Sequence, residues 1–177
     1  DHARGQVDPD EMNSDEMNSN VSHRGGSSIG YLADLDAVAA AAVLYLRMWA
    51  GGIDGQHRVQ QDLTNLLGDD RGHGAFETFA HLNEMCALHA RRPLMHHTPQ
   101  CKGLCADEAC VGQFVSTAAD GDAADTRLFA TLIVRPDVAP IVAGLAAQFG
   151  LAIKQMNLAP LKPRAATHTH QENQTLH

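Results

Sequence analysis

Aromatic residues are scarce in this chain, at 5% of its 177 residues, although hydrophobic residues as a whole make up 44%. A core with so few large rings has to be built from small aliphatic side chains. Such side chains suit closely packed helices better than strands, which favour β-branched and aromatic residues. The composition therefore favours an all-α fold, and the length is sufficient for one domain but hardly for two.

Basic residues are also few, with 13 Lys and Arg against 21 Asp and Glu, which gives a net charge of −8. The imbalance is concentrated at the N-terminus, because residues 1–20 hold six acids and only Arg4, and so carry −5 of that charge. The rest of the chain is close to neutral. Binding to the nucleic-acid backbone requires a basic surface that displaces counterions. We therefore expect no nucleic acid among the partners.

Long hydrophobic runs are missing as well. The longest uncharged run, residues 138–153, contains Pro140, Gly144 and Gly150 and is shorter than the ~20 residues that a membrane span needs. No basic segment followed by an apolar run opens the chain, as a secretory signal would require. These absences predict a cytoplasmic protein without membrane association. In a reducing compartment, clustered cysteines indicate metal or redox chemistry more often than structural disulfides.

The common catalytic signatures are absent too. The sequence contains no Gly-x-Ser-x-Gly elbow, no phosphate-binding loop, no His-Glu-x-x-His and no dinucleotide fingerprint. It therefore gives no basis for predicting an enzyme.

Apolar residues recur at helical spacing in six successive segments. Glycines or prolines separate most of them, as expected at helix ends. The segments are 31–50, 54–67, 73–91, 107–121, 123–134 and 136–150. The predicted fold is a single-domain helical bundle of five to six helices over residues 29–155. The polar stretches 1–28 and 156–177 have too few apolar residues to form a core, and we expect both to be disordered.

The feature that carries most chemistry is a cysteine cluster. Cys101, Cys105 and Cys110 lie within ten residues, and thiolates are ligands for zinc and for iron–sulfur clusters. Two cysteines five residues apart on one regular helix point ~140° apart around its axis. If Asp107 caps the following helix, however, Cys101 and Cys105 lie in the loop before it and Cys110 in its first turn. The three thiols can then converge on one metal ion.

A fourth ligand has to come from elsewhere in the chain. Cys86, on the third predicted helix, is the first candidate, and His97, four residues before Cys101, is its rival. The resulting hypothesis is a metal-binding protein, with zinc in a structural or a redox- or metal-sensing site and an iron–sulfur cluster as the alternative. A sensing site would act by changing a surface that another protein binds.

Other interpretations of the same residues remain open. Cys86 and Cys110 lie on apolar helix faces, where a free cysteine usually behaves as a small hydrophobic residue. Cys101 and Cys105 could instead form a reversible disulfide, which would make the loop a redox switch. With inert thiols, the remaining hypothesis is a metal-free helical module that binds another protein.

Three stretches of the body resemble small uncharacterised helical proteins of alphaproteobacteria. The stretches are Gly30-Tyr-Leu-Ala-Asp-Leu-Asp36, Arg92-Pro-Leu-Met95 and Ala130-Thr-Leu-Ile-Val-Arg-Pro-Asp137. The resemblance implies a helical fold over most of residues 28–156, and it implies no activity.

Overall fold

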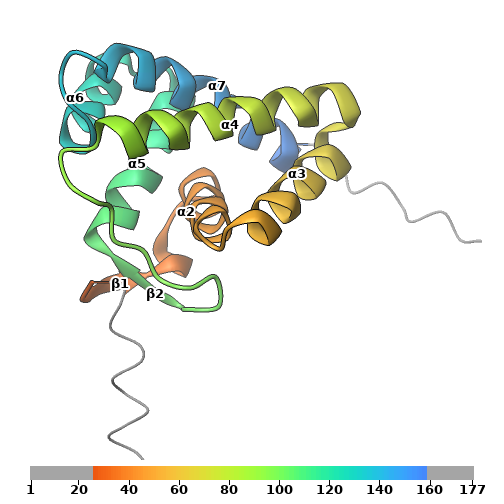
Figure 1. The fold of residues 1–177 in the computed structure, drawn as a ribbon, viewed down its shortest axis with the longest axis horizontal. Helices are drawn as coiled ribbons and strands as arrows, with labels where there is room; N and C mark the ends of the chain where they lie inside the picture. The colour runs from red at the N-terminus through yellow and green to blue at the C-terminus, as the bar shows by residue number, and fades with distance from the viewer. Residues whose placement is uncertain (1–25, 159–177) are drawn as a thin grey trace, which may run out of the picture.

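Six α-helices make up most of residues 26–158, the part of the chain that the computed structural model describes (Figure 1). The predicted all-α, single-domain fold is confirmed. No helix in this range is long and apolar enough to cross a membrane. The predictions of disorder at the two ends fall largely outside the described residues. The elements are β1 (Ser28–Tyr31), the 3₁₀ turn η1 (Leu32–Asp34), α2 (Ala37–Ala50), α3 (Ile53–Leu67), α4 (Asp69–His89), β2 (Gly103–Cys105), α5 (Ala106–Asp120), α6 (Ala123–Ile133) and α7 (Ala139–Leu158).

The first helix starts later than the periodicity predicts. Asp36 caps α2, because its carboxylate accepts hydrogen bonds from the backbone N–H groups of Val38 and Ala39, each at 2.9 Å. A carboxylate in this position satisfies two of the N–H groups that the first turn leaves without a partner. The residues before Asp36 form strand β1, which ends at Tyr31, and the turn η1. The expected helix from residue 31 is therefore wrong over its first turns.

Gly150 was expected to end the last helix, but α7 continues through it to Leu158. The glycine is needed for a close helix crossing. A Cβ atom at this position would lie 2.7 Å from the carbonyl oxygen of Val115 and from the Cβ of Ala119, both on α5. Only a residue without a side chain lets α5 and α7 approach so closely. Gly150 therefore serves helix packing and does not end the helix.

A two-stranded antiparallel sheet, which the sequence did not predict, joins the start of the described chain to the loop before α5. Strand β1 pairs with β2, with Ser28 opposite Cys105 and Tyr31 opposite Gly103. The backbone N–H of Leu32 extends this pairing by donating to the carbonyl oxygen of Lys102 at 3.0 Å. The sheet thus holds residues 102–105 in place (Figure 1).

The core lies where α2, α4, α5 and α7 pack together. Small residues fill much of it, as the composition predicts, and the few rings are concentrated at one point. Phe79 of α4 stacks on Phe149 of α7 with ring centroids 4.4 Å apart, and Tyr45 of α2 meets both rings edge-on. Such pairs add about 0.5–1.5 kcal/mol each to what burial alone contributes. This cluster joins α2, which carries part of the site described next, to α4 and α7.

Candidate functional site

A loop of 13 residues connects α4 to β2 and runs along the ends of α2 and α5 (Figure 1). Pro93 prevents α4 from continuing, since the residue before a proline disfavours helix. The start of the loop is fixed against the end of α6 instead. Ala90 forms a β-bridge with Val134, and the N–H of Arg91 donates to the carbonyl oxygen of Ile133 at 3.1 Å. The remainder of the loop carries His97 and Cys101 toward the start of α5.

A fully buried ion pair lies beneath this loop. Arg47 near the end of α2 and Glu108 in the first turn of α5 have side chains with no exposed surface. The Arg47 Nε lies 2.7 Å from Glu108 Oε1, and its Nη2 lies 3.0 Å from Oε2. This two-pronged geometry is the strongest form of an arginine–carboxylate contact. Because an unpaired charge is costly to bury, removing either Arg47 or Glu108 would destabilise the fold by leaving the other charge without a partner.

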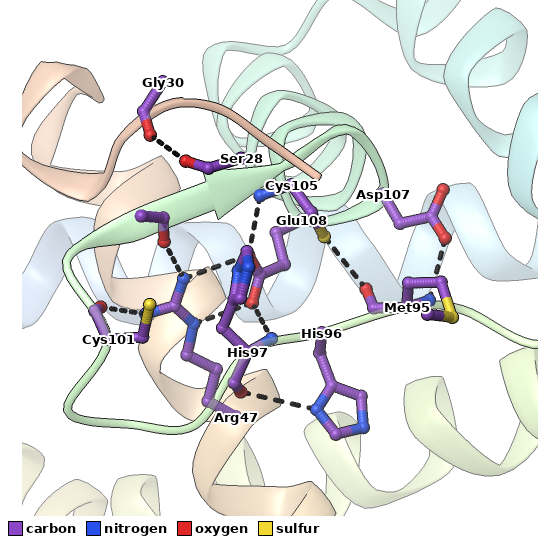
Figure 2. Close-up of polar contacts among 11 residues, drawn as sticks. Ser28, Gly30, Arg47, Met95, His96, His97, Cys101, Cys105, Asp107 and Glu108 are labelled. Atoms are coloured by element: carbon purple, nitrogen blue, oxygen red, sulfur yellow. Dashed lines mark hydrogen bonds and ion pairs between the residues drawn. The ribbon is translucent and has the colours of Figure 1, made fainter. Parts of the chain in front are cut away.

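Arg47 also holds the loop backbone. Its Nη1 donates to the carbonyl oxygen of Cys101 and its Nη2 to that of Gly103, both at 2.6 Å. Figure 2 shows the guanidinium between Glu108 on one side and these two carbonyls on the other. One side chain of α2 thereby fixes both ends of the turn that leads into β2.

Glu108 accepts three further hydrogen bonds from the other side. The backbone N–H of His97 donates to Oε1 at 2.7 Å, and the His97 ring nitrogen Nδ1 lies 2.9 Å from Oε2. The N–H of Cys105 donates to Oε2 at 3.0 Å, which makes Glu108 a cap of its own helix. Burial by itself raises the pKa of Glu108, but the hydrogen bonds from Arg47, Cys105 and His97 outweigh it and lower the pKa to about 2. Glu108 is therefore ionised at neutral pH.

Cys105 is the N-cap residue of α5 and lies next to Glu108 and His97. Its side chain donates to the carbonyl oxygen of Met95 at 3.3 Å, and burial raises the pKa of this thiol. Cys105 Sγ, a ring nitrogen of His97 and a carboxylate oxygen of Glu108 all lie within 4.8 Å of one another. Within residues 26–158 no other group of three His, Cys, Asp or Glu side chains meets this condition. We call His97, Cys105 and Glu108 the donor cluster.

The structure separates the other predicted ligands from this cluster. Helix α5 begins at Ala106, one residue after its cap Cys105, and not after a cap at Asp107. Cys110 therefore lies in the second turn and not in the first, on a different side of the helix from Cys105. It is half-buried and borders a cavity with Arg92 and Asp107. The predicted convergence of Cys101, Cys105 and Cys110 depended on the cap at Asp107, which is wrong.

Cys86 is half-buried against the core and lines a different cavity, next to Leu82 and Phe114. Burial raises its pKa to about 11, so it is a neutral thiol there. Cys101 is half-buried in the loop, with its carbonyl on Arg47, but its sulfur is outside the donor cluster. The structure thus brings together Cys105 and the rival fourth ligand, His97, and leaves Cys86 and Cys110 elsewhere.

Sequence reasoning missed Arg47 and Glu108. Two signals were available. Arg47 is the only charged residue in the otherwise apolar segment 37–50, and such a residue has to find a partner when its helix is buried. Glu108 follows the cap residue by three positions, which is the spacing of a capping box, although Cys105 is not a usual cap.

Asp107, next to Glu108, forms a second ion pair at the edge of the cluster. Its Oδ1 lies 2.6 Å from Arg92 Nη2, and its Oδ2 lies 2.7 Å from Arg92 Nη1. Oδ2 also accepts the backbone N–H of Met95 at 2.8 Å. The Arg92 guanidinium lowers the pKa of Asp107. The two neighbouring acids of α5 thus bind the loop at residues 92–97.

Comparison with known proteins gives no relative: no protein-family model, no curated protein and no solved structure matches the chain.

Proposed function

We propose that this protein binds a divalent transition metal, zinc in the first place, at the donor cluster. The observation that supports the proposal is the approach of one nitrogen, one sulfur and one oxygen donor to within 4.8 Å of one another. Zinc takes these three donor types, usually four at a time in a tetrahedron. Cys101 is the fourth ligand in this proposal. It lies in the same loop, and a rotation of its side chain has to bring the sulfur in.

The buried arginine sets a condition on this proposal. In the metal-free cluster Arg47 balances the charge of Glu108, and burial raises the pKa of the Cys105 thiol. A zinc ion that replaces the protons of Cys101 and Cys105 adds two positive charges and removes two. The net charge of the buried site then stays the same, and Arg47 keeps its contacts with the loop carbonyls. Zinc binding through Cys105 alone would leave one uncompensated charge, which is costly in a buried site.

An iron–sulfur cluster has less support, because it is usually held by four thiolates and Cys86 and Cys110 line separate cavities. The proposal includes a reducing location such as the cytoplasm. All four cysteines are free, and metal ligation requires reduced thiols. The proposal also includes a protein partner that binds the loop. The conformation of the loop would change when the Cys101 side chain rotates toward the metal, and this would change the binding of the partner.

Zinc content and affinity test the proposal. Reduced, full-length protein is titrated with zinc against a chromophoric chelator, and bound metal is counted by mass spectrometry. The double variant C101S/C105S is compared with the matched control C86S/C110S. We expect the first to lose about one equivalent of zinc, the count of a single tetrahedral site, and the control to keep it. His168, His170 and His177 are present in both variants, so any zinc that they bind cancels.

Proton release gives an independent measure. Since ligating thiols are deprotonated, binding should release about two protons per zinc near neutral pH in weakly buffered solution. Equal zinc binding by the two double variants, or binding with no proton release, would contradict the proposed site.

A further inference from the structure

The largest cavity described borders a different part of the loop and is not used by the donor cluster. It is a cleft of about 590 Å³ between the end of α2, the second half of α4 and residues 90–94. Its wall includes Trp49 of α2, Asn83 and Cys86 of α4, and Leu94 of the loop. Clefts of ~300–1,000 Å³ with mostly apolar walls are typical of small-molecule sites.

The cleft has a second, smaller cavity as its neighbour on the core side. This small apolar void of about 30 Å³ shares Leu46, Asn83, Cys86 and Leu94 with the cleft. Phe79 and Phe114 close the far side of this void. Atoms that line an apolar void lack contacts that a hydrocarbon group would supply. The cleft therefore favours a ligand with an apolar end that points inward.

The mouth of the cleft is positively charged. Arg91 and Arg92 are part of its lining, and no acidic side chain is. The two arginines differ in how far their charge is balanced. Arg92 is paired with Asp107, whereas Arg91 donates to the carbonyl oxygen of Thr131 at 3.1 Å and forms no ion pair among residues 26–158. A neutral carbonyl leaves the charge of Arg91 available to an anion.

We propose that the cleft binds a small amphipathic carboxylate, such as a medium-chain fatty acid. The hydrocarbon chain would lie along Trp49, Leu46 and Leu94 toward the void, and the carboxylate would contact Arg91 at the mouth. This inference rests on the shape and charge of the cleft. It does not depend on the metal proposal, because none of the three donor-cluster residues lines the cleft.

The chain contains its own probe for this site. Trp49 is its only tryptophan, and its ring is held against Phe76 and Phe79, with centroids 5.8 and 5.4 Å away. A ligand that enters the cleft changes the surroundings of a fixed indole ring. Titration of the full-length protein with octanoate should give a saturable change in tryptophan fluorescence. Octanol, which has the same chain length and no charge, is the comparison ligand.

Two variants separate the charge from the cavity. Arg91→Gln removes the cation at the mouth and should weaken octanoate binding about three- to fivefold, the size expected of an exposed charge contact, with no effect on octanol. Arg71→Gln, at an exposed position in the first turn of α4, is the matched control and should change neither. Ala87→Phe fills the cleft at an exposed lining position and should weaken binding of both ligands.

Equilibrium dialysis with labelled octanoate on wild-type protein checks the fluorescence result. No saturable binding in either measurement would overturn the proposal. Equal affinities for octanoate and octanol, with Arg91→Gln behaving like Arg71→Gln, would overturn the assignment of a carboxylate. Circular dichroism of Ala87→Phe shows whether that variant folds, and Arg91→Gln remains decisive if it does not.

Discussion

Asp107 and Glu108 are neighbours in the first turn of α5, and each pairs with an arginine through two contacts of 2.6 to 3.0 Å. Their distances are nearly equal, but their surroundings are not. The side chains of Arg47 and Glu108 are fully buried, whereas 64% of the Arg92 side chain and 10% of the Asp107 side chain are exposed. Exposure to solvent, and not distance, therefore decides how much each pair contributes to the stability of the fold.

Arg47 and Glu108, the inner pair, are fully buried, so each is stable in the core only while the other is present. Arg47 and Glu108 together satisfy two loop carbonyls and three N–H groups, so the loss of either partner leaves a charge and several polar groups without compensation. In the outer pair, formed by Arg92 and Asp107, most of the Arg92 side chain is exposed, and an exposed charge contributes less to stability than a buried one. The inner pair should therefore determine whether the loop at residues 97–105 keeps its conformation. The outer pair should contribute less, at residues 92–95.

The largest expected effect is that of Arg47→Met. Methionine fills most of the space but leaves the Glu108 carboxylate buried without a cation, and the free energy of unfolding should fall by about 4 kcal/mol. Urea denaturation at pH 7 measures it. The double variant Arg47→Met/Glu108→Gln keeps a neutral hydrogen-bond acceptor and removes the charge, so it should recover part of the loss. Equal losses in the single and double variants would show that charge is not the cause.

The second expected effect is on acid stability. The pKa of Glu108 is about 2 in the folded protein and about 4.3 in an unfolded chain. A carboxyl group with a lowered pKa contributes stability that is fully present above its unfolded pKa and is lost as the pH falls toward its folded pKa. Wild-type protein should therefore lose more stability between pH 5 and pH 2.5 than Glu108→Gln does. Thermal unfolding of both across this range is the measurement, and parallel curves would contradict it.

Helical periodicity predicted the fold well because the apolar core depends on local repeats. The segment 54–67 became α3 (Ile53–Leu67), and residues 123–134 became α6 (Ala123–Ile133). The errors come from contacts distant in sequence. Gly150 continues a helix because of its neighbours on α5, and the β1–β2 sheet joins residues more than 70 positions apart. No local pattern carries that information.

The candidate site was predictable only in part, for the same reason. Cys101, Cys105 and His97 lie close in sequence, so their shared loop could be anticipated. Arg47 and Glu108 are 61 residues apart, and neither residue alone indicates the other as its partner. A shift of two residues in the helix cap, from Asp107 to Cys105, was also enough to turn Cys110 away from the loop. Metal binding at this loop stays a prediction.

The smallest expected effect is that of Arg92→Gln, which tests the comparison from the exposed side. Asp107 loses its cation but keeps the N–H of Met95, and most of the Arg92 side chain is already exposed, so the free energy of unfolding should fall far less than it does for Arg47→Met. Because mobile ions screen exposed charges, the difference between this variant and wild type should shrink in 0.5 M NaCl, while the effect of Arg47→Met should hardly change. Urea denaturation at low and high salt checks both statements. A loss for Arg92→Gln as large as that for Arg47→Met would show that the outer pair, and not burial of the inner one, holds the loop in place.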